Sequence, residues 1–227
     1  MLHSVDFHAY QHTAVDFVKS TPKCALWLDM GLGKTSSTLT AIRELLDSAD
    51  VGRALVVAPL RVAVSTWPAE LTKWEQLDGL TVKVIRGTPK QRVEQLLHDR
   101  SDIHVINREL VTWLVDTIQK HPEFKKRRAW AYDTVVIDES SSFKDHASKR
   151  FKALRKTIPA TTRLVELTGT AAGNGYRIKV EDAGNTDTFA EAPVFRVQGQ
   201  LQLTRPELSI AGVKLQVLLT TLQERMF

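Results

Sequence analysis

Six short apolar runs, separated by segments with helical periodicity, constrain the fold of this chain more than any other feature. The runs occupy residues 24–28, 54–58, 81–85, 103–106, 134–137 and 163–167. Helical patterns lie between them, at 34–46, 63–74 (interrupted near Pro68), 89–99, 108–119 and 145–157. Strands that alternate with helices predict crossover connections and a mostly parallel sheet with helices on both faces. We therefore predict an α/β fold.

The composition excludes several classes of protein. No window approaches the roughly 18 consecutive apolar residues of a membrane span. The N-terminus lacks the basic start and apolar core of a secretory signal. One cysteine, Cys24, excludes an internal disulfide framework and a cysteine-rich zinc site, and we expect it to be a small buried hydrophobe. We expect a cytoplasmic protein without a membrane partner.

The formal charge of +5 is unevenly distributed. The whole excess lies in residues 1–170, because residues 171–227 hold equal numbers of basic and acidic side chains. The densest positions are Lys125, Lys126, Arg127, Arg128, Lys144, Lys149, Arg150, Lys152, Arg155 and Lys156. A basic face is the electrostatic footprint of a nucleic-acid binder, although charge alone fits a solvated helix surface equally well.

The sequence LDMGLGKT, residues 28–35, stands between an expected strand and an expected helix. Glycines such as Gly31 and Gly33 let backbone N–H groups approach a phosphate chain at the positive end of the helix. Lys34 can then reach the β- and γ-phosphates, and the Thr35 hydroxyl can bind magnesium. We expect ATP and Mg²⁺ here. The alternative is a glycine turn with an incidental lysine, since Leu28 stands where the common P-loop pattern has its first glycine.

A second motif, VVIDES at 135–140, ends another apolar strand. A nucleotide-bound magnesium needs a carboxylate, and hydrolysis needs a second one to polarise water. Asp138 and Glu139 are adjacent, so they can serve the metal and the water respectively. Carboxylates often merely end strands, but open α/β sheets bind ligands at the carboxyl ends of their strands, where both motifs lie.

These motifs belong to a set that resembles the first RecA-like lobe of superfamily-two helicases, specifically Swi/Snf-type double-stranded DNA translocases and their phage relatives. The set comprises AYQHTAVDF (9–17), DMGLGKT (29–35), VVAPLRVAVSTWPAELTKW (56–74), INRELV (106–111), DES (138–140) and LTGT (167–170). The resemblance thus covers residues 9–170 in the order of the family's motifs.

The resemblance implies roles for individual residues, each of which also has a plainer structural explanation. It implies nucleotide binding by Gln11 (on adenine), Met30, Gly31, Leu32, Gly33, Lys34, Thr35 and Ser36, and catalysis by Lys34, Asp138 and Glu139, with magnesium on Thr35 and Asp138. It implies DNA contact or coupling by Pro59, Arg61, Thr66, Asn107, Thr168, Gly169 and Thr170. The plainer explanations are a surface helix position for Gln11, core packing for Trp67 and Trp74, a strand end for Pro59 and simple turns for Thr168 and Thr170.

The chain departs from the family pattern after LTGT. Ala171 stands where the family usually has proline, and beyond Tyr176 the likeness ends. Alternation at 195–204 and again at 213–217 predicts a β-hairpin. We therefore predict a lobe at 1–175 and a β-rich or irregular tail at 176–227, with a terminal helix as a further possibility. A truncated gene fused to another tail, or a change of reading frame, would explain this pattern.

Two functions are compatible with these motifs. The first is an ATP-binding lobe that contacts double-stranded DNA without sequence preference. The family's second lobe, which supplies an arginine finger, is not recognisable, so we expect weak ATP turnover unless a second lobe or a partner protein completes the site in trans. The second is a non-catalytic protein derived from such a lobe, which binds DNA or a partner and acts by competition.

Overall fold

The structure is a computed structural model that describes residues 2–126, 130–143, 145 and 147–169, and the backbone of four strands between 179 and 218. Its central strands are β1 (Lys23–Leu28), β2 (Ala54–Ala58), β3 (Val82–Val84), β4 (Ile103–Asn107), β5 (Thr134–Asp138) and β6 (Arg163–Thr168). They pair in the order β1-β6-β5-β2-β4-β3, and every pair among them is parallel. The predicted α/β fold with a mostly parallel sheet is confirmed.

The helices connect the strands as the sequence predicted, with local differences. They are α1 (Ala9–Ser20), α2 (Lys34–Asp47), α3 (Trp67–Leu71), α4 (Pro89–His98), α5 (Val111–Lys120), α6 (Pro122–Lys126) and α7 (Lys149–Arg155). The helix predicted at 63–74 is divided, because a π-helix, η2 (Val62–Thr66), precedes α3. Short 3-10 turns are η1 (Ser4–Asp6), η3 (Glu75–Leu77), η4 (Arg108–Leu110), η5 (Ser140–Phe143) and η6 (Ile158–Ala160).

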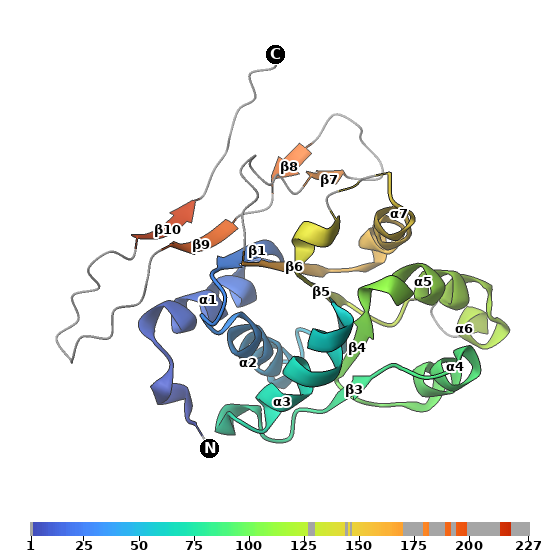
Figure 1. Cartoon of the computed structure of the whole chain (residues 1–227), viewed down its shortest axis with the longest axis horizontal. Coiled ribbons are helices and arrows are strands. Elements are labelled where there is room, and N and C mark those ends of the chain that lie inside the picture. Colours follow the sequence, from blue (N-terminus) through green and yellow to red (C-terminus); the bar gives the residue numbers. More distant parts are fainter. Residues whose placement is uncertain are drawn as a thin grey trace, which may run out of the picture.

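Helices cover both faces of the sheet because the central strands are apolar on both faces. Along β2, Ala54, Val56 and Ala58 join the core cluster under α1, α2 and α3, whereas Leu55 and Val57 join the cluster under α4, α5 and α7. In Figure 1, α1 to α3 accordingly lie together on one side of the sheet and α4 to α7 on the other. Burial on both faces is typical of a parallel sheet.

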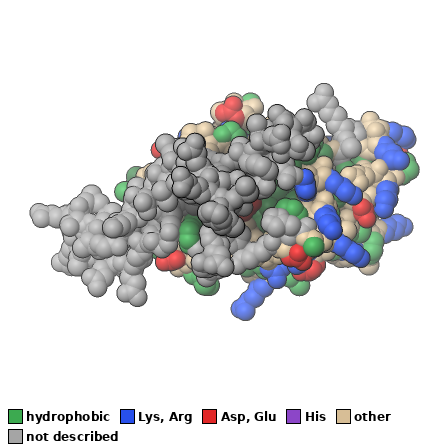
Figure 2. Space-filling view, turned by 90° about the horizontal axis from the view of Figure 1, so that it is seen from above, with side chains coloured by type: hydrophobic (Ala, Val, Ile, Leu, Met, Phe, Trp, Pro, Cys, Tyr) green, Lys and Arg blue, Asp and Glu red, His purple; other side chains and the backbone are tan. Residues whose placement is uncertain are grey.

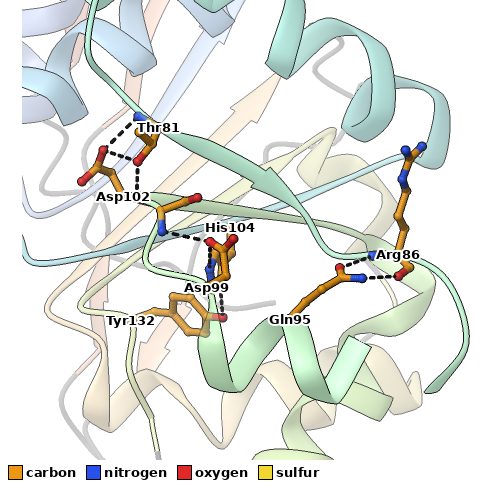
Figure 3. A network of polar contacts seen from close by, with 8 residues as sticks. Thr81, Arg86, Gln95, Asp99, Asp102, His104 and Tyr132 are labelled. Carbon is orange, nitrogen blue, oxygen red and sulfur yellow. Dashed lines mark hydrogen bonds and ion pairs between the residues drawn. The ribbon is translucent and has the colours of Figure 1, made fainter. Parts of the chain in front are cut away.

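A polar network joins β3, α4 and β4 (Figure 3). The His104 ring, 0% exposed, lies between the Tyr132 hydroxyl, 2.7 Å from Nδ1, and Asp99 Oδ1, 3.2 Å from Nε2. Nearby, Asp102 Oδ2 accepts hydrogen bonds from the backbone N–H and the hydroxyl of Thr81. Each buried polar side chain of this group therefore has a partner, as buried polar groups require.

The described strands of the tail are β7 (Lys179–Glu181), β8 (Phe189–Glu191), β9 (Val194–Gln198) and β10 (Lys214–Leu218). Strands β9 and β10 pair antiparallel, in the two segments for which a hairpin was predicted. Strand β9 also pairs in parallel with β1, so it adds to the β1 edge of the main sheet. The boundary at 175/176 stays a prediction, and the terminal helix lies outside the described residues.

Among the residues with a described structure, no helix has both the length and the apolar character that crossing a membrane requires.

Candidate functional site

The loop between β1 and α2 contains two glycines whose backbone has a positive φ. Gly31 and Gly33 have φ of +83° and +75°, the left-handed region that glycine adopts without strain. A Cβ on Gly33 would also lie 2.2 Å from Gln11 Nε2, whereas one on Gly31 would meet nothing within 4 Å. Gly33 is therefore favoured by its conformation, and a side chain there would also displace the Gln11 amide.

The side chain of Lys34 closes this loop. Its ammonium donates to the carbonyl oxygen of Leu28 at 2.7 Å and to that of Asp29 at 3.1 Å. Burial lowers the pKa of Lys34, and the nearby carboxylates of Glu139 and Asp138 offset part of this effect. The ammonium is thus held over the loop by its backbone, and the phosphate-binding role of Lys34 stays a prediction.

Asp138 is the last residue of β5, two strands from β1, and Glu139 follows it. Asp138 is buried, its Oδ2 accepts from the Trp67 indole Nε1–H at 2.9 Å, and its Oδ1 accepts from the Glu139 backbone N–H at 3.0 Å. Burial raises the pKa of Asp138, whereas the hydrogen bond from Trp67 acts in the opposite direction. Glu139 has a φ of +54°, which is uncommon for a non-glycine residue and turns the chain sharply at the strand end.

Helix α1 begins against the loop between β1 and α2. Gln11 is buried, and its Oε1 accepts from the His8 backbone N–H at 3.0 Å. The Tyr10 hydroxyl donates to the Leu32 carbonyl oxygen at 3.2 Å. The surface position considered for Gln11 is therefore wrong, and Tyr10 is a loop contact that the sequence analysis missed.

The other loop residues lie at different depths. The Met30 side chain is 84% exposed, and Leu32 packs against the core beneath α1 and α2. Thr35 is half-buried in the first turn of α2. Ser36 is buried, and its hydroxyl donates to the Gly33 carbonyl oxygen at 3.0 Å. Of these side chains, the position of Thr35 fits a metal ligand best, because Ser36 already serves the backbone.

The residues expected to touch DNA lie at the carboxyl ends of the strands, as does the loop between β1 and α2. Pro59 follows β2 and Asn107 ends β4, and the register of these neighbouring strands places Ala58 beside Asn107. Arg61 is exposed before the π-helix, whose last residue is Thr66. The Asn107 Oδ1 accepts from the Glu109 backbone N–H at 3.3 Å.

The end of β6 lies against the loop between β1 and α2. Thr168 is buried, and a Cβ on Gly169 would lie 3.4 Å from Lys34 Nζ. The third expected coupling residue, Thr170, lies outside the described residues. The carboxyl ends of adjacent strands thus bring together the loop after β1, the end of β6, Asp138 at the end of β5, Pro59 after β2 and Asn107 at the end of β4.

A hollow of about 210 Å³ lies at the far end of this row of strand ends. It is lined by Leu60, Ala63, Val64, Val84, Ile85, Arg86, Gly87, Arg92, Asn107 and Leu110. The guanidinium of Arg92 stacks over the Trp113 ring, 4.2 Å from its centroid. The hollow is therefore apolar at its base, with arginine and asparagine side chains around it.

Basic side chains gather away from the loop. Figure 2 shows Lys and Arg crowded at the end of the molecule where Figure 1 places α4 to α7. In α7, Arg150 pairs with Glu109, whereas Lys149 and Lys152 are exposed. Three dense basic positions, Arg127, Arg128 and Lys144, lie outside the described residues.

Two other site features escaped the sequence analysis. Trp67 was interpreted as core packing, and it is 0% exposed, but its indole also holds Asp138. Glu166 stands inside β6, where burial raises its pKa to about 7 although Ser140 donates a hydrogen bond to it. A lone carboxylate within the apolar run RLVEL was the signal for Glu166, since glutamate is rarely buried without a partner.

Neither a cluster of ligand side chains nor Cys24 offers a further metal site among the described residues. In the part of the chain that the structure describes, no group of three or more His, Cys, Asp or Glu side chains could hold a metal ion. Cys24 is buried, and burial raises its pKa to about 12, as expected of a small buried hydrophobe. A metal at this site would therefore depend on Thr35, Asp138 and the ligand's own oxygens.

Comparisons with known proteins agree with this geometry. The profile of the SNF2-related domain matches residues 10–183. Protein p41 of Acyrthosiphon pisum secondary endosymbiont phage 1 is 36% identical over 172 residues, which are 73% of this chain and 36% of that protein. The DNA excision repair protein ERCC-6-like of Mus musculus is 30% identical over 152 residues, 66% of this chain and 12% of the mouse protein. The chain thus spans about a third of the phage relative and about a tenth of the mouse relative.

Solved structures are similar in fold. The Sulfolobus solfataricus SWI2/SNF2 ATPase core in complex with double-stranded DNA matches with a TM-score of 0.59 and 26% identity, over 73% of this chain and 32% of that one. The UvsW helicase of bacteriophage T4 matches with a TM-score of 0.52 and 14% identity, over 72% of this chain and 52% of that one, a likeness of fold alone. The predicted RecA-like fold is confirmed.

Proposed function

Because the chain belongs to the SNF2-related domain family, we propose that it binds Mg-ATP at the loop between β1 and α2 and contacts double-stranded DNA along the same sheet edge. The chain has the fold of a Swi/Snf-type ATPase lobe. Because the chain spans only part of its much longer relatives, the family assignment does not extend to movement along DNA driven by ATP.

One observation carries the proposal. The Lys34 ammonium lies over a glycine loop at a helix start, within electrostatic reach of the Asp138 and Glu139 carboxylates. The loop and the carboxylates come from β1 and β5, which the parallel register with β6 holds two strands apart. A cation beside backbone N–H groups suits a polyphosphate, and a buried carboxylate next to it suits its magnesium.

Each group would act through its own chemistry. The bound Mg-ATP supplies the phosphoryl group that is transferred to water. Lys34 would exchange the Leu28 and Asp29 carbonyls for phosphate oxygens, and Thr35 and Asp138 would hold the metal. Glu139, which follows Asp138 with a left-handed backbone, would orient the water and accept its proton. Gln11 contacts the adenine from the start of α1.

Calorimetric titration with Mg-ATP tests nucleotide binding. We expect wild type to bind and Lys34→Ala to lose about 10-fold to 100-fold in affinity, because a charge-assisted contact is worth about 1.5–3 kcal/mol. Lys23→Ala is the matched control, since Lys23 lies at the amino end of β1 and the loop with Lys34 follows the carboxyl end of the same strand. Absence of binding by folded wild type, or equal affinity of the two variants, would refute the proposal.

The DNA contact is supported by the arrangement of Pro59, Arg61 and Asn107 and by the SWI2/SNF2 core that was solved with double-stranded DNA. We expect weak binding without sequence preference and with strong salt dependence, because phosphate contacts release counterions. Arg61→Ala should lower the logarithmic salt slope by about 1. Arg100→Ala, an exposed arginine before the amino end of β4, should leave the slope unchanged.

Turnover is a separate part of the proposal. The family resemblance implies an arginine finger from a second lobe, and such a residue is worth about 10³–10⁵ in rate. We propose that this lobe alone hydrolyses ATP slowly and that a second lobe, whichever chain supplies it, accelerates the reaction. Phosphate release measured with and without duplex DNA tests this. DNA binding without any nucleotide binding would instead favour the non-catalytic alternative.

A further inference from the structure

The carboxylate of Asp138 is held by a side chain from another element. The Trp67 indole Nε1–H donates to Oδ2 at 2.9 Å, while the neighbouring Glu139 backbone N–H occupies Oδ1. Trp67 is 0% exposed, so the indole is fixed by the core on all sides. The orientation of the proposed metal ligand therefore depends on the position of Trp67.

Trp67 in turn depends on a π-helix. Its backbone N–H donates to the Val62 carbonyl oxygen, five residues earlier, which is the bond that defines η2 (Val62–Thr66). The hydrogen bond of a π-helical turn spans one residue more than that of an α-helical turn. Such turns are rare in proteins, and those that occur are often found at functional sites. If η2 tightened to α-helix, the register of Trp67 would change by one residue, about 100° around the helix axis.

The π-helix lies within the segment proposed to contact DNA. Arg61 precedes it and Thr66 ends it. The segment is packed at Ala63 and Trp67, both 0% exposed, and it borders the 210 Å³ hollow through Ala63 and through Leu60 and Val64, which are 59% and 40% exposed. The turn is thus anchored in the core at Trp67 and has open space beside Leu60 and Val64.

We propose that Trp67 is a positioning residue that couples the DNA-contacting segment to the metal site: contacts at Arg61–Thr66 set the geometry of the π-helix, and the indole N–H transmits it to the Asp138 carboxylate. This inference rests on the proposed function, because it requires both the DNA contact and the magnesium. A buried tryptophan often finds a partner for its N–H, so the test must separate coupling from core packing.

The first test compares Trp67→Phe with Trp74→Phe. The first variant keeps an aromatic ring but removes the donor to Asp138. Trp74 is the matched control, because it is 9% exposed, belongs to the same core cluster and donates instead to Glu70 Oε2 at 2.9 Å. Calorimetry with the ATP analogue AMP-PNP is run in magnesium and in EDTA, so that metal dependence is separated from nucleotide binding.

We expect Trp67→Phe to lose nucleotide affinity only when magnesium is present. Partners that orient a metal ligand typically contribute about 10-fold to 100-fold to metal affinity. Trp67→Phe should therefore lose about that factor in magnesium while its affinity in EDTA stays at the wild-type value, and Trp74→Phe should match wild type in both. A folded Trp67→Phe with the wild-type magnesium dependence would overturn the inference alone. Wild type that binds no AMP-PNP would overturn the proposed function and this inference together.

A second measurement uses wild type, in case Trp67→Phe does not fold. Nitrogen-15 labelling of the tryptophans resolves the indole N–H resonances of Trp67 and Trp74 by NMR. Addition of a short DNA duplex without nucleotide should move the Trp67 resonance and leave that of Trp74 in place. Duplex that binds without moving the Trp67 resonance would overturn the coupling, and Arg61→Ala should weaken the response in parallel with DNA affinity.

Discussion

Acid should destabilise this lobe through His104. The chemistry of its partners defines the ring's state: the Asp99 carboxylate needs a donor, so Nε2 carries the proton, and Nδ1 accepts from the Tyr132 hydroxyl (Figure 3). Burial lowers the pKa of His104 to about 4 from the ordinary 6.5, although the bond to Asp99 opposes the shift. The folded protein therefore keeps this ring neutral over a range in which the unfolded chain protonates it.

The size of the effect follows from linkage. Below pH 6.5 His104 binds a proton in the unfolded state, whereas in the folded state it stays neutral down to about pH 4. Stability is therefore complete above pH 6.5 and falls as the pH drops toward 4. At about 1.36 kcal/mol per pKa unit, the loss is about 3 kcal/mol.

Urea unfolding at several pH values between 7 and 4 measures this loss. His104→Gln replaces the ring with an uncharged amide, so its stability should fall by about 3 kcal/mol less than that of wild type over the range. His98→Gln is the control, because His98 is exposed on α4, where it pairs with Glu94, and it should follow wild type. Parallel losses in wild type and His104→Gln would refute the reasoning.

Three further predictions concern the loop, β6 and the tail. Gly33→Ala should cost more stability than Gly31→Ala: both meet about 1–2 kcal/mol of left-handed strain, but a Cβ on Gly33 also strikes Gln11, and comparative urea unfolding checks the order. Glu166→Gln should gain stability over wild type as the pH rises from 5 to 8, because burial raises the folded pKa of Glu166 to about 7 and its ionisation then destabilises the fold; equal curves would contradict this. A 1–175 truncation should fold and bind nucleotide but melt several degrees lower, since β1 loses its β9 neighbour; aggregation in light scattering would instead place the tail in the core.

Local sequence patterns predicted the elements that rest on local physics. The apolar runs identified all six central strands because parallel strands are buried on both faces, and the glycine loop was predictable because few residues accept a positive φ. Helix α4 begins with Thr88 as its N-cap and Pro89 at its first position, and both residue types are common at these positions of a helix start.

Contacts between distant segments were not predictable in this way. The bond from Trp67 to Asp138 joins residues 71 positions apart, and only the sheet order brings them together. The π-helix has no sequence signature, since the pattern at 63–74 is that of an ordinary helix. The role of His104 depends on Tyr132, which lies 28 positions away and across the polar network.

A crystal structure with AMP-PNP and magnesium tests the central claim most directly. We predict a triphosphate over Gly31 to Lys34, with the Lys34 ammonium moved from the Leu28 and Asp29 carbonyls to phosphate oxygens. We also predict a metal held by Thr35 and Asp138. A nucleotide bound elsewhere, or Lys34 still bonded to the two carbonyls beside a bound nucleotide, would contradict it.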